Sequence, residues 1–233
     1  MTDYRHSGWI VVGTSPLARP ALARAREWEL AEWCDRFPVT ITTNGGIRIL
    51  PVPDIYFAHD FVAIDHYEPE ALYAAAHGTR LIGPNLRIPE PIKRALTYGL
   101  PPNQKVVNTV RYHLRGAELI DLDEYEPLQL SGMFIVEYAA RSGTNEVLLC
   151  GMDGYANDGS ERYAEGVYGH GQPFGRELTE RIIVPRVNTL LRKYPHVQFT
   201  CIGRPVYADQ IEPADNWRIK WLDDPTPCDP SRS

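Results

Sequence analysis

The chain has 233 residues, of which 43% are hydrophobic and 23% are charged, and its formal net charge is −6. This length suits one large α/β domain with a buried core, which excludes global disorder. General nucleic-acid binding is disfavoured because it needs clustered Lys and Arg, and no apolar run approaches the roughly 18 residues of a membrane span. We therefore expect a soluble, cytoplasmic protein, with peripheral attachment to a membrane left open.

The first 60 residues are predicted to alternate strands with loops that are rich in glycine and polar side chains. The expected elements, in chain order, are a strand at 9–12, a helix at 21–37, a strand at 39–43 and a strand at 55–58. This order indicates parallel strands joined by right-handed crossovers. The loops that follow the three strands supply candidate ligand contacts, namely Gly13, Thr14, Ser15, Asn44, His59 and Asp60.

The middle of the chain, residues 69–127, gives a weaker signal. A helix at 70–77 and a strand at 79–83 are followed by many prolines and polar residues. We interpret this region as a variable insert, which is a lid, an acceptor-binding subdomain or an oligomer contact.

The second half is predicted to return to regular structure. We expect a helix at 133–141, a strand at 146–150, a helix at 178–194 that Pro185 kinks, and a last strand at 197–202. We expect residues 156–177 to form a site loop between the strand at 146–150 and the helix at 178–194. The tail at 223–233 is predicted to be flexible. The order of these elements predicts one Rossmann-like domain over residues 1–222, with a doubly wound, mostly parallel α/β sheet.

The cysteines are scattered, with no C-x-x-C spacing; they are Cys34, Cys150, Cys201 and Cys228. Cys150 and Cys201 lie in apolar runs that are typical of strands. We predict buried free thiols.

The stretch from Ser131 to His170 carries the strongest functional signal. A helix opens at Ser131-Gly132, and the next strand ends in Gly-Met-Asp-Gly-Tyr, which supplies Asp153, Gly154 and Tyr155. The loop that follows holds Tyr163 and His170. Open α/β sheets bind ligands at the carboxyl ends of their strands, and helix N-termini bind anions. This stretch is therefore the candidate site.

Several common motifs are missing from the sequence. There is no G-x-x-x-x-G-K-[ST], no G-x-G-x-x-G after the first strand, no zinc-ligand spacing and no G-x-S-x-G. Asp121-Leu122-Asp123 spells D-x-D, which some glycosyltransferases use to hold a metal, but a surface loop is the favoured interpretation. No metal site and no cofactor are predicted.

The combined pattern resembles the bacterial sialyltransferases of glycosyltransferase family 42. The resemblance rests on Ser131-Gly132 before a helix, a strand that ends G-M-D-x-Y, a second tyrosine and a later Gly-His. Gly-Thr-Ser-Pro-Leu after the first strand and Thr43-Asn44 after the second resemble nucleotide-contacting loops of that family. The motility-accessory-factor proteins and their pterin pyrophosphokinase relatives share parts of the pattern. The likeness covers roughly residues 9–60 and 129–207 and implies a GT-A-like variant of the fold.

The resemblance also implies a reaction and roles for the candidate residues. The activity would be an inverting, metal-independent transfer of a sugar, sialic acid or another nonulosonate, from a CMP- or other nucleotide-activated donor to an acceptor hydroxyl. Tyr155 and Tyr163 would stabilise the leaving phosphate and His170 would be the general base. Thr14 and Asn44 would contact the nucleotide, and the remaining candidates, Gly13, Ser15, His59, Asp60, Ser131, Gly132, Asp153 and Gly154, would line the donor site.

Departures from the family pattern leave the donor sugar open. Thr14 stands in place of an asparagine, and Leu128 or Gln129 in place of an arginine, while the loop between Tyr163 and His170 is short. The alternatives are a pterin-type pyrophosphokinase that uses ATP and Mg²⁺, and a non-catalytic nucleotide-binding module.

Structural interpretations stand beside the functional ones. Asn44 could serve only its turn, Ser131 could only cap a helix, and Asp153 could only pin its loop. Trp217 and Trp221 are interpreted as packing residues or as a contact in a homo-oligomer.

Overall fold

A computed structural model shows one sheet of eight strands in the order β5-β4-β3-β2-β1-β6-β7-β8, and every neighbouring pair is parallel. It describes residues 8–32, 38–58, 61–84, 116–121, 125, 130–154, 164, 167 and 179–223. The strands are β1 Trp9–Val12, β2 Val39–Thr43, β3 Ile55–Phe57, β4 Arg80–Pro84, β5 Glu118–Ile120, β6 Glu146–Cys150, β7 Gln198–Ile202 and β8 Trp217–Lys220. The prediction of a doubly wound α/β fold is confirmed.

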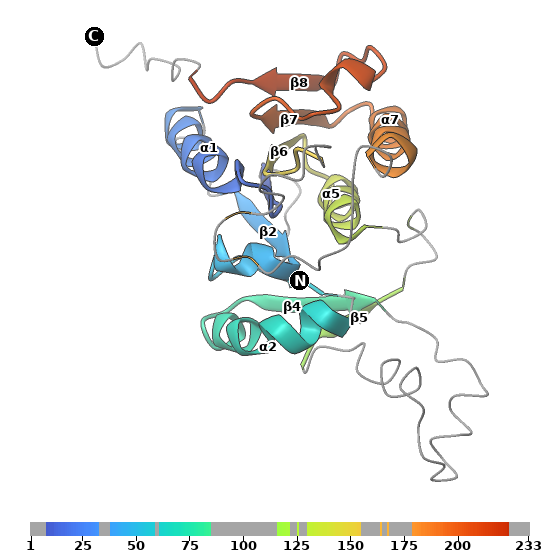
Figure 1. The fold of residues 1–233 in the computed structure, drawn as a ribbon. Coiled ribbons are helices and arrows are strands. Elements are labelled where there is room, and N and C mark those ends of the chain that lie inside the picture. Colours follow the sequence, from blue (N-terminus) through green and yellow to red (C-terminus); the bar gives the residue numbers. More distant parts are fainter. Residues whose placement is uncertain are drawn as a thin grey trace, which may run out of the picture.

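The helices connect these strands (Figure 1). They are α1 Ala18–Glu32, α2 Phe61–Ala76, α5 Ser131–Arg141 and α7 Val184–Lys193, with short turns η1 Asn44–Arg48, η2 Thr179–Ile183 and η3 Ala208–Gln210. No helix within the described ranges is both long enough and apolar enough to span a bilayer.

The chain winds outward from β1 in both directions. It passes from β1 through β2, β3 and β4 to β5, returns by α5, and resumes on the other side of β1 with β6. Trp9 is therefore paired with Val39 of β2 on one side and with Val147 of β6 on the other. The connections after β1 and β6 lead to strands on opposite sides of this pair, so the carboxyl ends of β1 and β6 are the topological switch point where open α/β sheets bind ligands.

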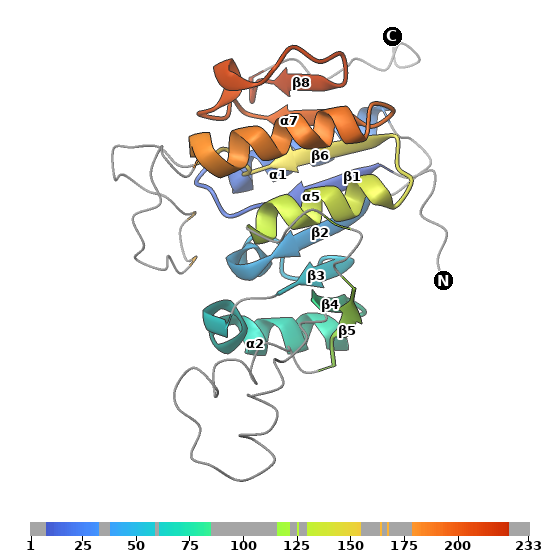
Figure 2. The same ribbon diagram turned by 90° about the vertical axis from the view of Figure 1, so that its right-hand side faces the viewer.

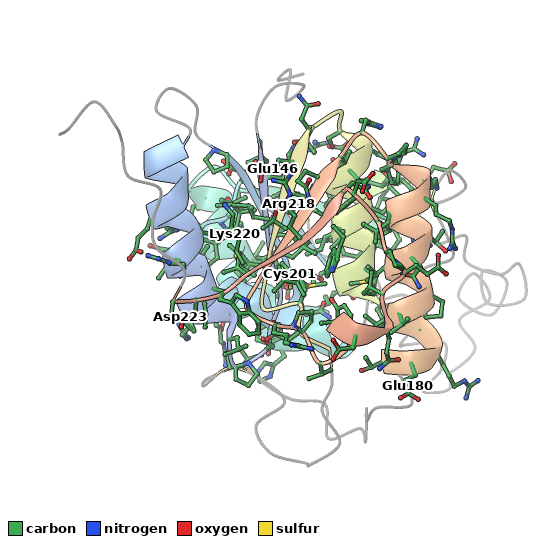
Figure 3. The ribbon with its side chains drawn as sticks, turned by 90° about the horizontal axis from the view of Figure 1, so that it is seen from above. Glu146, Glu180, Cys201, Arg218, Lys220 and Asp223 are labelled. Carbon is green, nitrogen blue, oxygen red and sulfur yellow. The ribbon has the colours of Figure 1, made fainter. Side chains whose placement is uncertain are left out.

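Helices cover both faces of the sheet because right-handed crossovers in opposite directions place their helices on opposite faces. Helix α1 lies on one side, and α5 and α7 lie side by side on the other (Figures 2 and 3). Successive β1 residues alternate accordingly: Trp9 and Val11 pack with the α5 and α7 side chains, whereas Ile10 and Val12 pack with α1.

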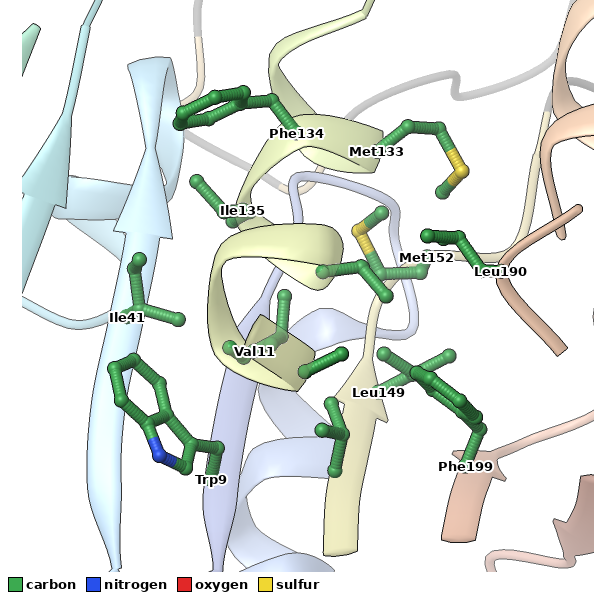
Figure 4. Packing of buried hydrophobic residues seen from close by; sticks show 14 of the residues in the cluster. Trp9, Val11, Ile41, Met133, Phe134, Ile135, Leu149, Met152, Leu190 and Phe199 are labelled. Atoms are coloured by element: carbon green, nitrogen blue, oxygen red, sulfur yellow. The ribbon is translucent and has the colours of Figure 1, made fainter. Parts of the chain in front are cut away.

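The larger core lies between the sheet, α5 and α7 (Figure 4). Phe134 of α5 stacks on Phe57 of β3 with ring centroids 4.2 Å apart. Cys201 belongs to this core and Cys150 to the core under α1, and both are free thiols. Burial raises the pKa of both thiols, so they remain neutral. The prediction of buried thiols is confirmed for these two; Cys34 and Cys228 lie outside the described residues.

A buried ionic cluster joins α5 to α7. Glu137 has no exposed surface, and its two carboxylate oxygens accept hydrogen bonds from Arg186 and from Lys193, the latter at 2.7 Å. The Tyr194 hydroxyl also donates to Glu137, at 3.3 Å. Burial raises the pKa of Tyr194 to about 12, so the phenol keeps its proton. This cluster is called the α5–α7 clamp below.

Helix starts are the main errors of the prediction in the first half. Helix α1 begins at Ala18 rather than at residue 21, because Ser15 accepts from the backbone N–H groups of Leu17 and Ala18 and Pro20 is tolerated in a first turn. Helix α2 begins at Phe61 rather than at residue 70 and contains Pro69 within it.

In the second half, the prediction missed two strands and misplaced a kink. Both missed strands, β5 and β8, form edges of the sheet, so β7 is not the last strand. Pro185 lies in the first turn of α7 and follows the π-helical turn Thr179–Ile183 instead of kinking one long helix. Trp217 of β8 is half-buried against the larger core, as the packing interpretation predicted.

Candidate functional site

The loops after β1 and β6 are joined through their backbones at the switch point. The Gly13 N–H donates to the Cys150 carbonyl at 2.8 Å, and the Ser15 N–H donates to the Gly151 carbonyl at 3.3 Å. A Cβ at Gly13 would lie 2.2 Å from the Gly151 carbonyl oxygen, which no other residue could accommodate. The closeness of the two loops therefore explains a glycine directly after β1.

Ser15 and Asp153 connect the same two loops through their side chains. The Ser15 hydroxyl donates to Oδ2 of Asp153, and Asp153 is only 7% exposed. Its other oxygen, Oδ1, is buried and accepts no hydrogen bond within the described residues. Burial raises the pKa of Asp153 to about 6, and the Ser15 hydroxyl offsets part of that rise. The structural interpretation of Asp153 is consistent with this bond, although the carboxylate fastens the β6 loop to the β1 loop rather than bonding the backbone of its own turn.

The backbone of the β6 loop is instead held by residues that the sequence analysis did not single out. The Tyr207 hydroxyl donates to the Met152 carbonyl at 2.7 Å, and the Val206 N–H donates to the Asp153 carbonyl at 2.9 Å. Complete burial raises the pKa of Tyr207, so this donor stays neutral. Gly154, with φ +81°, then turns the chain out of the loop.

Asn44 lies just after β2 in a left-handed conformation, with φ 48°. Asparagine tolerates this region better than most residues, which suits the turn after β2. The Asn44 carbonyl accepts from the buried Tyr56 hydroxyl at 3.2 Å, and the Thr43 hydroxyl donates to Oδ1 at 3.3 Å. Nδ2 of the same side chain donates to the Ser131 hydroxyl at 3.3 Å. Asn44 therefore serves more than its own turn.

Ser131 is the first residue of α5, and its hydroxyl does not cap the helix. The capping position belongs to Leu130, which makes no side-chain cap bond. Gly132 lies close to the β6 loop, since a Cβ there would be 2.9 Å from Cε of Met152. The Phe134 N–H donates to the Leu130 carbonyl at 3.1 Å, so this bond closes the first turn of α5.

The described candidates thus form one continuous group at the carboxyl ends of β2, β1 and β6. Asn44 contacts Ser131, Gly132 borders Met152, and Asp153 bonds Ser15. The remaining candidates, His59, Asp60, Tyr155, Tyr163 and His170, lie outside the described residues. Two members that the sequence analysis missed, Ala164 and Val167, contact the same loops. Their small and aliphatic side chains gave no chemical signal.

Of the D-x-D sequence, Asp121 is exposed after the edge strand β5, and the other two residues lie outside the described part. Among the described residues, no group of three or more His, Cys, Asp or Glu side chains is arranged to hold a metal ion.

Comparison with known proteins adds one structural likeness. No protein-family model matches the chain, and no curated protein matches it significantly. Among solved structures, it is similar to the sialyltransferase CstII from Campylobacter jejuni in complex with a substrate analogue, cytidine-5'-monophosphate. The identity is 14% and the TM-score 0.47, over 90% of this chain and 86% of that chain. A likeness at this level does not assign a family.

Proposed function

We propose that the protein is an inverting, metal-independent glycosyltransferase that transfers a nonulosonate, such as sialic acid, from a CMP-activated donor to an acceptor hydroxyl. The observation that carries this proposal is the contact between Asn44 and Ser131. It joins an amide at the end of β2 to the N-terminus of α5, beside the loops at the switch point. The motif resemblance implies that both residues would line the donor site.

The start of α5 suits an anionic donor. The first N–H groups of a helix are unpaired within it and carry the positive end of the helix dipole, so they favour a phosphate or a carboxylate. A CMP-nonulosonate has both groups. Thr43 and Ser131 fix the side-chain amide of Asn44, and Tyr56 fixes its backbone carbonyl, so the residue offers a preset hydrogen-bonding edge to the nucleotide.

The chemistry proposed for the bond-breaking step uses Tyr155, Tyr163 and His170. Two phenols donate hydrogen bonds to the departing phosphate and offset its growing charge without a metal. A neutral imidazole removes the proton of the acceptor hydroxyl as that oxygen attacks the anomeric carbon. The attack comes from the face opposite the leaving phosphate, so the anomeric configuration inverts.

The surroundings of Asp153 do not favour the alternative, a pyrophosphokinase in which this residue binds Mg²⁺. A magnesium ligand is an ionised carboxylate with open access to the ion. Asp153 is only 7% exposed, and one of its two oxygens already accepts from the Ser15 hydroxyl.

Ligand-induced stabilisation distinguishes these functions. CMP at 100 times its Kd should raise the melting temperature by about 5–10 °C, because binding adds about 2.7 kcal/mol to a domain of this size. UDP and GDP serve as controls for the base. ATP should stabilise the protein only weakly, with or without Mg²⁺. A Mg²⁺-dependent rise in melting temperature with ATP but not with CMP would instead support the pyrophosphokinase.

A single variant tests the proposed base. His170→Ala should abolish transfer from CMP-sialic acid, measured as CMP release with an acceptor sugar, and should leave the CMP-induced shift unchanged. The matched control is His196→Ala, an exposed histidine before β7 at the opposite edge of the sheet. Equal loss of binding and transfer in His170→Ala would make its role structural.

A further inference from the structure

Two residues between β6 and η2 are fastened to the β1 loop. The Ala164 N–H donates to the Thr14 carbonyl at 2.8 Å, and the Val167 N–H donates to the Ala164 carbonyl at 3.0 Å. Ala164 is 4% exposed and belongs to the core under α1. These bonds connect Val167 through Ala164 to the loop after β1.

The side chain of Val167 packs against the turn that carries Asn44. A Cβ at Gly45 would lie 2.3 Å from Cγ1 of Val167 and 2.7 Å from the Tyr67 hydroxyl, so the valine fills the space that a side chain at position 45 would need. Val167 is also partly buried against the core under α1. Because valine is stiff about χ1, it holds this position with little loss of side-chain entropy.

We infer that Val167 is a positioning residue that holds Ala164 against the Thr14 loop, beside the Asn44 turn. The inference rests on the proposed function, in which Asn44 contacts the nucleotide and Tyr163, the residue before Ala164 in the sequence, donates to the leaving phosphate. The contact of Val167 with Gly45 then ties the part of the site that binds the donor to the part that acts on it.

Loss of this contact should affect turnover more than nucleotide affinity. Asn44 is held from other sides by Tyr56, Thr43 and Ser131, so its amide keeps its orientation without Val167. Ala164 is held to the β1 loop by one backbone hydrogen bond, and a displacement of about 1 Å at a reacting group can lower a rate by up to about 100-fold. For Val167→Ala we expect kcat to fall about tenfold and the Kd for CMP to change less than threefold.

The test combines kinetics with hydrogen exchange. Val167→Ala should speed exchange of the Ala164 amide about tenfold and lower kcat at saturating donor, whereas Val167→Ile, which keeps both γ carbons, should restore both. Val52→Ala is the matched control, because this valine is 43% exposed and precedes β3 at the other edge of the sheet. Rates are expressed per CMP-binding site, so a loss of folded protein alone does not lower them.

The two hypotheses fail in different ways. Unchanged exchange at Ala164 in Val167→Ala overturns the inference, and so does an unchanged kcat in an active protein. Faster exchange in a protein that neither binds CMP nor transfers a sugar overturns the proposed function and reduces Val167 to a packing contact. Faster exchange with a selective loss of kcat supports both.

Discussion

Two buried carboxylates, Glu137 in the α5–α7 clamp and Asp153 at the switch point, have opposite surroundings. Glu137 is 0% exposed, and two cations and a phenol donate to its oxygens. Asp153 is 7% exposed and receives one hydroxyl, and no described group donates to its Oδ1. In the clamp, both carboxylate oxygens of Glu137 accept hydrogen bonds. At the switch point, only one carboxylate oxygen of Asp153 has a donor among the described residues.

This difference separates a residue that holds the fold from one that marks a site. A buried ion pair with complete hydrogen bonding fixes the relative position of two helices, and its removal leaves uncompensated charges. An acid whose pKa is raised by burial at the edge of a ligand-binding sheet is a candidate for function. Burial does not distinguish the two carboxylates, but their hydrogen-bond partners do.

The largest expected effect comes from breaking the clamp. Glu137→Gln keeps the shape of the side chain but removes the carboxylate that pairs with Arg186, whose side chain is only 11% exposed. The free energy of unfolding should fall by about 3–5 kcal/mol, measured by guanidinium denaturation at pH 7.5.

Glu212→Gln is the matched control for this change. Its partner Arg192 is also on α7, but the two side chains are 59% and 61% exposed, so the loss should stay below about 1 kcal/mol. Equal losses in the two variants would show that the clamp is no more than a surface pair.

The next effect concerns the pH dependence of Asp153. The carboxyl pKa rises from 3.8 unfolded to about 6 folded, so the folded state prefers the neutral acid. As the pH increases through this interval, ionisation should remove up to about 3 kcal/mol of stability from the wild type, at about 1.36 kcal/mol per pKa unit. Asp153→Asn still accepts from Ser15 and cannot ionise, so it should lack this decline.

The measurement is the difference in unfolding free energy between variant and wild type at pH 3.5 and pH 7.5. The difference should shift in favour of Asp153→Asn at the higher pH. Asp209→Asn, at a side chain that is 86% exposed and pairs with Arg204, controls for loss of a surface carboxylate. A difference that stays constant with pH would remove the contrast between Asp153 and Glu137.

The smallest expected effect is a difference in stability between serine variants at the two ends of α5. Ser131→Ala removes the acceptor of the Asn44 amide and should lower stability by about 1 kcal/mol, whereas Ser142→Ala, which loses only a bond to the Tyr138 carbonyl, should stay within about 0.5 kcal/mol. CMP affinity should fall only in Ser131→Ala. A loss of affinity in both variants would indicate a general effect of α5 instead.

The central strands could be predicted from the sequence because buried parallel strands are continuous apolar runs that end at glycine or polar residues. Val39–Thr43 and Glu146–Cys150 have the expected bounds. The edge strand β8 could not, because its half-exposed residues follow no such pattern. It is fastened by the Asn216 amide, which donates to the carbonyls of Leu191, Tyr194 and Val197.

Within the candidate site, sequence position identified the residues but not their partners. Asn44 and Ser131 are 87 positions apart, and Ser15 and Asp153 are 138 positions apart. Their pairing follows from the placement of β6 beside β1, which no local pattern encodes. Val167 was missed because its side chain has no reactive group. Its contribution is a packing contact with Gly45, and that contact exists only in the folded structure.

The central place of β1 also sets an order for synthesis. Trp9–Val12 pair with Val147–Cys150 as well as with β2, so one side of this apolar strand stays unpaired until the ribosome has released more than half of the chain. Long-range parallel pairing of this kind forms slowly and exposes apolar surface in the meantime. The nascent N-terminal half should therefore depend on chaperones until β6 emerges, and a truncation before residue 146 should aggregate rather than fold.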